Sequence, residues 1–202
     1  MAVFDRRLAT RAGAPATHGF SAGTLLDTVC GARPVEWLRP GDALANGRGQ
    51  AVLVSWRGIV GWGRGICIAE GALGDGHPTR TMVVASEQCV SVACEAAITL
   101  VGHPAPWMRA GDLLGTCDGV RLARSRTAMV AIHTSEVASL TQAGLEFRSW
   151  APAQAKSMLQ DQKRTPVVDP APFLYDQGEC DGRPVLDARE VAWLFKRAPS
   201  RP

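Results

Sequence analysis

Short apolar runs, each bounded by Gly, Pro or other turn-forming residues, recur along the first 150 residues of the chain. They are rich in Val, Ile, Leu, Thr and Trp, as residues 51–59 and 128–133 illustrate. Runs of this length and composition are typical of β-strands, and no helical periodicity is visible among them. The pattern therefore predicts an all-β domain.

The character of the sequence changes after Pro152. Residues 153–164 are mostly helix-forming and contain neither Gly nor Pro, whereas residues 165–184 are rich in Pro, Asp and Gly and are expected to be extended. We therefore predict that residues 153–202 form a C-terminal extension with one or two short helices.

The last helix of this extension has a recognisable start. Asp187 is followed three residues later by Glu190, the spacing of a capping box. Val191, Leu194 and Phe195 then follow at helical spacing. We expect this helix to dock its apolar stripe on the β domain.

Composition and charge narrow the class of protein. The chain has 22 basic and 19 acidic residues, a net charge of +3, and 46% hydrophobic residues. This balance favours a soluble globular protein and gives no basic patch for nucleic acid. No apolar stretch is long enough to span a bilayer, and residues 1–18, expected to be a flexible segment, do not resemble a secretory signal. We expect a cytoplasmic monomer that binds neither nucleic acid nor membrane.

Six cysteines allow about fifteen disulfide pairings, and their spacing favours none of them. Reduced thiols fit the expected compartment better. A zinc site is an alternative, because its ligand types are present in Cys89, Cys94, His103 and Cys117. Their spacing matches no tight zinc knuckle, and Cys is commonly a small buried apolar residue. We therefore expect no metal and no cofactor.

Several sequence blocks follow one another in a distinctive order. Gly19-Phe20-Ser21-Ala22-Gly23-Thr24 opens the series, and Arg33-Pro34-Val35-Glu36-Trp37-Leu38-Arg39-Pro40-Gly41-Asp42 follows it. The later blocks are Val54 to Gly58, Glu70 to Gly74, Trp107 to Leu114 and Gly144 to Pro152. In order and spacing they resemble a bacterial Hedgehog/intein (Hint) domain over residues 19–152.

The resemblance implies a horseshoe-like β fold in which the two ends of the domain lie side by side. Within the second block, Val35, Trp37 and Leu38 are expected to be core residues. Trp56, Trp62 and Trp107 are candidate surface aromatics, although packing in the core is favoured for each.

The resemblance also implies a self-processing chemistry. In Hint domains a Cys or Ser at the first position attacks the preceding carbonyl, and a His in a Ser-x-x-His or Thr-x-x-His block protonates the departing nitrogen. Here the first position is Gly19, the block that begins at Ser86 ends in Cys89, and His133 falls off the family spacing. His18, beside Gly19, is expected to be solvent-exposed in a loop.

The missing groups predict a degenerate Hint domain that no longer cleaves itself. We expect it to act as a binding or structural module for an unidentified protein partner. The alternative is residual self-processing, in which Ser21 or a displaced thiol such as Cys89 or Cys94 attacks a peptide bond.

Overall fold

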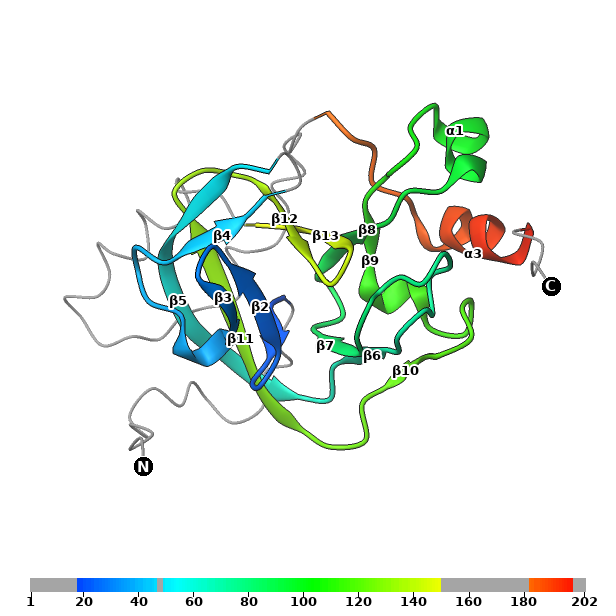
Figure 1. The fold of residues 1–202 in the computed structure, drawn as a ribbon. Coiled ribbons are helices and arrows are strands. Elements are labelled where there is room, and N and C mark those ends of the chain that lie inside the picture. Colours follow the sequence, from blue (N-terminus) through cyan, green and yellow to red (C-terminus); the bar gives the residue numbers. More distant parts are fainter. Residues whose placement is uncertain (1–17, 47–48, 150–181, 198–202) are drawn as a thin grey trace, which may run out of the picture.

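The computed structural model describes residues 18–46, 49–149 and 182–197 (Figure 1). Apart from His18, the N-terminal segment expected to be flexible lies outside these ranges, and so does the helix predicted over residues 153–164. The described residues are mostly β-strand, as the sequence pattern predicts.

Two sheets make up the β-structure of the described residues. The larger has the strand order β10-β6-β7-β1-β11-β5-β4-β2-β3, and the smaller has the order β12-β13-β8-β9. The strands are β1 (Phe20–Ser21), β2 (Leu25–Thr28), β3 (Gly31–Pro34), β4 (Ala43–Ala45), β5 (Ala51–Gly63), β6 (Ile66–Ile68), β7 (Met82–Val84), β8 (Cys89–Ser91), β9 (Met108–Arg109), β10 (Val120–Leu122), β11 (Thr127–Thr134), β12 (Ser139–Gln142) and β13 (Leu145–Arg148).

The long antiparallel pair of β5 and β11 lies on the side of the molecule that holds β2, β3 and β4 (Figure 1). The first residues of β5 pair with β4, and residues 54–63 pair with β11. Strand β11 is buried along almost all of its length because it lies between β5 and the short central strand β1. This arrangement places β1, and the residues just before it, in the interior.

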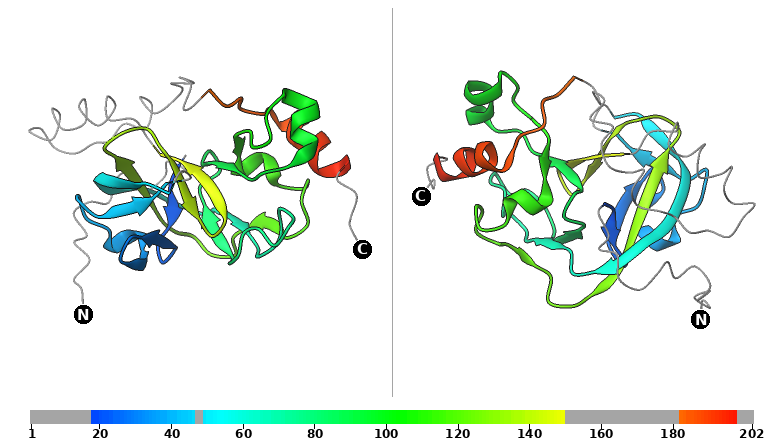
Figure 2. Two further views of the ribbon diagram at one scale, coloured as in Figure 1. Left: turned by 45° about the horizontal axis from the view of Figure 1, so that its top comes forward. Right: turned by 180° about the vertical axis from the view of Figure 1, so that it is seen from behind.

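Helical segments gather at the end of the molecule opposite β2, β3 and β4 (Figures 1 and 2). Helix α1 spans Glu95–Val101 and contacts α3, which spans Ala188–Arg197. The 3-10 turn η3 (Ala110–Leu113) also contacts α3, whereas η2 (Val35–Trp37) lies near β3.

Two of these helices test the sequence predictions. The helix expected after Asp187 is present as α3, and its amide groups bond the Asp187 carboxylate as expected for an N-cap. The first 150 residues show no helical periodicity in sequence, yet the short helix α1 lies there. It has only seven residues and ends at Gly102, whose φ of 73° stops the helix, so it is too short to give a periodic pattern.

The core prediction for the second sequence block is right at two positions and wrong at one. Val35 and Leu38 are fully buried, but Trp37 between them is 65% exposed. The tight η2 turn points successive side chains in different directions, so not all three side chains reach the core. None of the helices in the described ranges has both the length and the apolar character needed to cross a bilayer.

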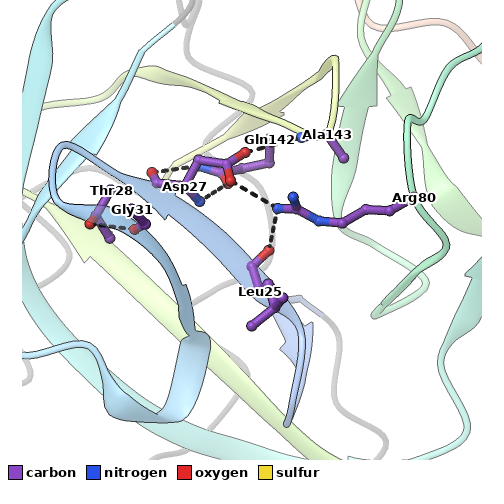
Figure 3. A network of polar contacts seen from close by, with 7 residues as sticks. All are labelled: Leu25, Asp27, Thr28, Gly31, Arg80, Gln142 and Ala143. Atoms are coloured by element: carbon purple, nitrogen blue, oxygen red, sulfur yellow. Dashed lines mark hydrogen bonds and ion pairs between the residues drawn. The ribbon is translucent and has the colours of Figure 1, made fainter.

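A polar network centred on Asp27 joins β2 to the β12–β13 hairpin (Figure 3). Gln142 accepts a hydrogen bond from the Asp27 amide and donates to the Asp27 carbonyl oxygen at 3.3 Å. Arg80 donates to the Asp27 carboxylate at 3.1 Å and to the Leu25 carbonyl at 2.9 Å. The network thereby ties three segments that are distant in sequence.

Candidate functional site at Gly19

Gly19 immediately precedes β1 and is held tightly against β11. Its φ is 106°, in the region that favours glycine, and a Cβ built at this position would lie 2.6 Å from the carbonyl oxygen of Val130. The adjoining Phe20 pairs with Val130 and with Val84 on the other side. The space that a side chain at position 19 would need is therefore occupied by the backbone of β11.

The turn formed by residues 85–88 forms hydrogen bonds with both the amide and the carbonyl of Gly19. The Ala85 amide donates to the Gly19 carbonyl at 2.9 Å, and the Gly19 amide donates to the side-chain oxygen of Gln88 at 3.0 Å. Gln88 is 3% exposed. These bonds come from one turn, in which the Gln88 amide bonds the Ala85 carbonyl at 3.1 Å.

Gln88 also connects the two ends of the domain. Its side-chain nitrogen donates to the carbonyl oxygen of Arg148 at 3.1 Å and to that of Cys89 at 3.3 Å. The rings of Phe20 and Phe147 meet edge to face with 5.2 Å between centroids. The expectation that the two ends lie side by side is confirmed.

The orientation of the Gln88 side-chain amide follows from its partners. The Gly19 amide requires an acceptor, whereas the carbonyl oxygens of Arg148 and Cys89 require donors. The group that faces the Gly19 nitrogen is therefore an oxygen that carries no proton.

The contact of Gly19 with the 85–88 turn and the end of β13 is called the junction below. Two histidines lie in the interior beside it. His18 is 2% exposed, so the expectation that it is solvent-exposed is wrong. It is buried because β1, which follows it closely, is a central strand of the large sheet. His133, on β11, is fully buried, and its ring lies 4.7 Å from that of Trp56 between centroids. The junction therefore holds two imidazoles inside the protein.

Burial determines the charge of both rings. Desolvation, together with the nearby His133, lowers the pKa of His18 to about 3. Desolvation lowers the pKa of His133 to about 4. Near neutral pH both imidazoles are therefore uncharged, and neither is an effective proton donor.

The remaining predicted site residues flank Gly19 with different roles. Ser21 lies on β1, and its hydroxyl donates to the carbonyl of the next residue, Ala22, at 3.2 Å. The carbonyl of Ser86 accepts a bond from the Gly111 amide at 2.8 Å. Cys89 begins β8 and pairs with Arg109 of β9. The structure brings the 86–89 segment to Gly19, but the contact with the Gly19 amide comes from Gln88 rather than from Cys89.

The zinc alternative finds no support in the described ranges. They contain no group of three or more His, Cys, Asp or Glu side chains that could hold a metal ion. Within the same ranges the cysteines form no disulfide, and Cys180 lies outside them. His103, one of the candidate ligands, accepts a hydrogen bond from the Ala105 amide at 3.1 Å.

The comparison with protein families decides what this scaffold is. Residues 18–139 match the model of the Hint domain family. The chain belongs to the Hint domain family. It therefore has the mostly β Hint fold, with a short helical extension at its C-terminal end, and it is related to the self-processing superfamily that includes inteins.

Inteins are among the solved structures that are similar to this chain. The crystal structure of the gp41-1 intein is 11% identical with a TM-score of 0.46, and the match covers 66% of this chain and 98% of that one. A DnaB intein from Synechocystis sp. PCC 6803 is 9% identical with a TM-score of 0.45, covering 66% and 99%. No curated protein matches the sequence of this chain.

Sequence reasoning missed two residues of the Hint junction, Gln88 and His18. Gln88 stands next to Cys89 in the Ser86 block, and the sequence does not say which of two neighbours in a turn faces Gly19. His18 adjoins Gly19, and its burial depends on the non-local pairing of β1 with β7 and β11. No local signal in the sequence carries that information.

Proposed function

We propose that this Hint domain does not cleave itself and serves as a binding or structural module. The observation that carries the proposal is the environment of Gly19. It has no side chain to attack the His18 carbonyl, and its amide nitrogen faces the oxygen of Gln88. Cleavage of the His18–Gly19 bond requires a nucleophile and a proton for the departing nitrogen.

The same geometry weighs against a substitute nucleophile. An acyl shift at Ser21 would require its hydroxyl to approach the carbonyl of Phe20, which precedes it. The hydroxyl instead donates to the carbonyl of Ala22. In addition, His18 and His133 are uncharged at neutral pH and do not replace the missing acid.

We also propose a bacterial origin, on the resemblance of the sequence blocks, and a cytoplasmic location. The module is proposed to be a monomer that binds a protein partner.

The test is the intact mass of the purified full chain, measured before and after incubation with a thiol and with hydroxylamine at neutral pH. We expect one species at the full-length mass under all conditions. A fragment that begins between Gly19 and Ser21 would contradict the proposal. The variants Ser21→Ala and Cys89→Ser, measured alongside, would identify the nucleophile responsible.

A further inference from the structure

The C-terminal segment, residues 183–194, pairs with the edge of the small sheet at Trp107, just before β9. The amide of Trp107 donates to the Pro184 carbonyl at 2.9 Å, and the amide of Leu186 donates to the Trp107 carbonyl at 2.8 Å. Trp107 and Val185 thereby form a parallel β-bridge. The pairing is the main-chain recognition by which an extended peptide adds to the edge of a sheet.

Arg183 supplies a charged anchor for this segment. Its guanidinium carbon lies 4.1 Å from the centroid of the Trp107 ring, and the ring itself is fully buried. The same guanidinium pairs with the Glu146 carboxylate and donates to the Ala105 carbonyl at 3.4 Å. Because the Arg183 side chain is 9% exposed, the ion pair and the cation–π contact are weakly screened by solvent.

Helix α3 supplies an apolar anchor directly after the extended part. Asp187 caps the helix, and its own amide donates to the carboxylate of Glu190 at 2.8 Å, which completes a capping box. Leu186, Val191 and Leu194 are each at most 2% exposed. The helix contacts η3 and α1, the two segments that gather beside it in Figures 1 and 2.

Three independent kinds of contact thus converge on one short stretch of chain: a β-bridge, a stacked and paired guanidinium, and an amphipathic helix. Residues 150–181 separate it along the chain from the domain on which it docks.

We propose that the surface around Trp107, Glu146, η3 and α1 is a peptide-recognition site, and that residues 183–194 occupy it as a separable ligand carried by the same chain. The site recognises an Arg-Pro pair and an aliphatic residue in extended form, followed by an Asp-capped amphipathic helix. The proposal goes beyond loss of cleavage and holds whether or not the His18–Gly19 bond is ever broken.

The test uses the full chain with a site-specific protease sequence inserted after residue 165. After cutting, we expect the two fragments to co-elute in size-exclusion chromatography, and a fluorescently labelled peptide of residues 181–197 in excess to exchange into the complex. Separation of the fragments would overturn the proposal. Co-elution without peptide exchange would overturn it too, because the segment would then be an inseparable part of the core.

A matched pair of arginine variants tests the anchor. Arg183→Met keeps an apolar stem but removes the guanidinium, and we expect it to weaken binding of the labelled peptide at least about tenfold. Arg189→Ala removes an exposed arginine from the same segment and should leave binding unchanged. Equal binding by the two variant peptides would refute the recognition of Arg183.

Discussion

Two buried glutamines bind main-chain groups through both the oxygen and the nitrogen of their side-chain amides, and their surroundings differ. Each such contact is called a glutamine clamp below. Gln88 accepts from the Gly19 amide and donates to the Arg148 carbonyl, so that it links the two ends of the domain. Gln142 accepts from the Asp27 amide and donates to the Asp27 carbonyl, so that it grips a single residue (Figure 3). Both side chains are buried, at 3% and 0% exposure.

The surroundings of the two clamps separate them. The Gln142 clamp adjoins a half-exposed ion pair between Asp27 and Arg80, where water reaches the charged groups. The Gln88 clamp adjoins His18 and His133, which are buried and uncharged at neutral pH. The comparison shows that the Gln88 contact, unlike the Gln142 contact, lies among buried uncharged groups, which is consistent with the proposal that the domain does not cleave itself.

The largest expected effect is the response of the junction to acid. His18 and His133 have folded-state pKa values of about 3 and about 4, both below the ordinary 6.5. Between pH 6.5 and 4 the unfolded chain binds protons that the folded chain does not, so the free energy of unfolding falls as the pH falls. We expect a loss of about 5 kcal/mol between pH 7 and pH 4.5 from these two groups.

Urea unfolding at a series of pH values measures this dependence. The double variant His18→Gln, His133→Gln should flatten the profile over the same range, although it lowers stability at pH 7. A profile as steep as that of the unchanged protein would show that other groups cause the acid sensitivity.

The next effect is steric. Gly19→Ala places a Cβ against the Val130 carbonyl at a φ of 106°, and we expect it to lower the free energy of unfolding by about 3 kcal/mol. Gly23→Ala is the matched control, because Gly23 has a φ of 87° but open space around it, and should cost about 1 kcal/mol. Equal losses, measured by urea unfolding, would show that β11 does not restrict position 19.

The third experiment compares the clamps directly. Gln88→Leu leaves the buried amide of Gly19, as well as the carbonyl of Arg148, without its partner and should cost about 2 kcal/mol. Gln142→Leu affects only Asp27, which is partly exposed and accessible to water, and should cost about 1 kcal/mol. Chemical denaturation of both variants checks the order, and a larger loss at Gln142 would reverse the comparison.

The smallest effect is expected at the half-exposed ion pair. The side chains of Arg80 and Asp27 are 35% and 40% exposed, so Arg80→Ala should lower stability by less than about 1 kcal/mol. Added salt should reduce even this difference, since it screens exposed charges. Thermal unfolding of the variant at low and high salt measures both, and a loss well above this bound would contradict the assignment.

Much of the fold followed from local pattern. Short β-favouring runs predicted the strands, and the spacing of Asp187 and Glu190 predicted the capped helix. The resemblance placed Gly19 and Cys89 where Hint domains carry a nucleophile and a His, and the loss of cleavage inferred from this stays a prediction. These features depend on residues that are neighbours along the chain.

What the sequence did not predict depends on contacts between distant segments. His18 is buried because β1 pairs on both sides, and Gln88 reaches Gly19 because the 85–88 turn meets the start of β1. Trp37 points outward because the turn around it is tight. In each case the decisive partner lies many residues away or the local geometry is irregular.

The central structural claim is that the β11 backbone and Gln88 close the junction to cleavage. The measurement that tests it most directly is the intact mass of the double variant Gly19→Cys, Cys89→His, incubated with a thiol at a low temperature where circular dichroism shows it folded. The variant restores both groups that Hint cleavage needs. The account predicts an uncut chain, because the Val130 carbonyl occupies the side-chain space and Gln88 presents an oxygen to the departing nitrogen. Release of residues 1–18 by thiol would contradict it.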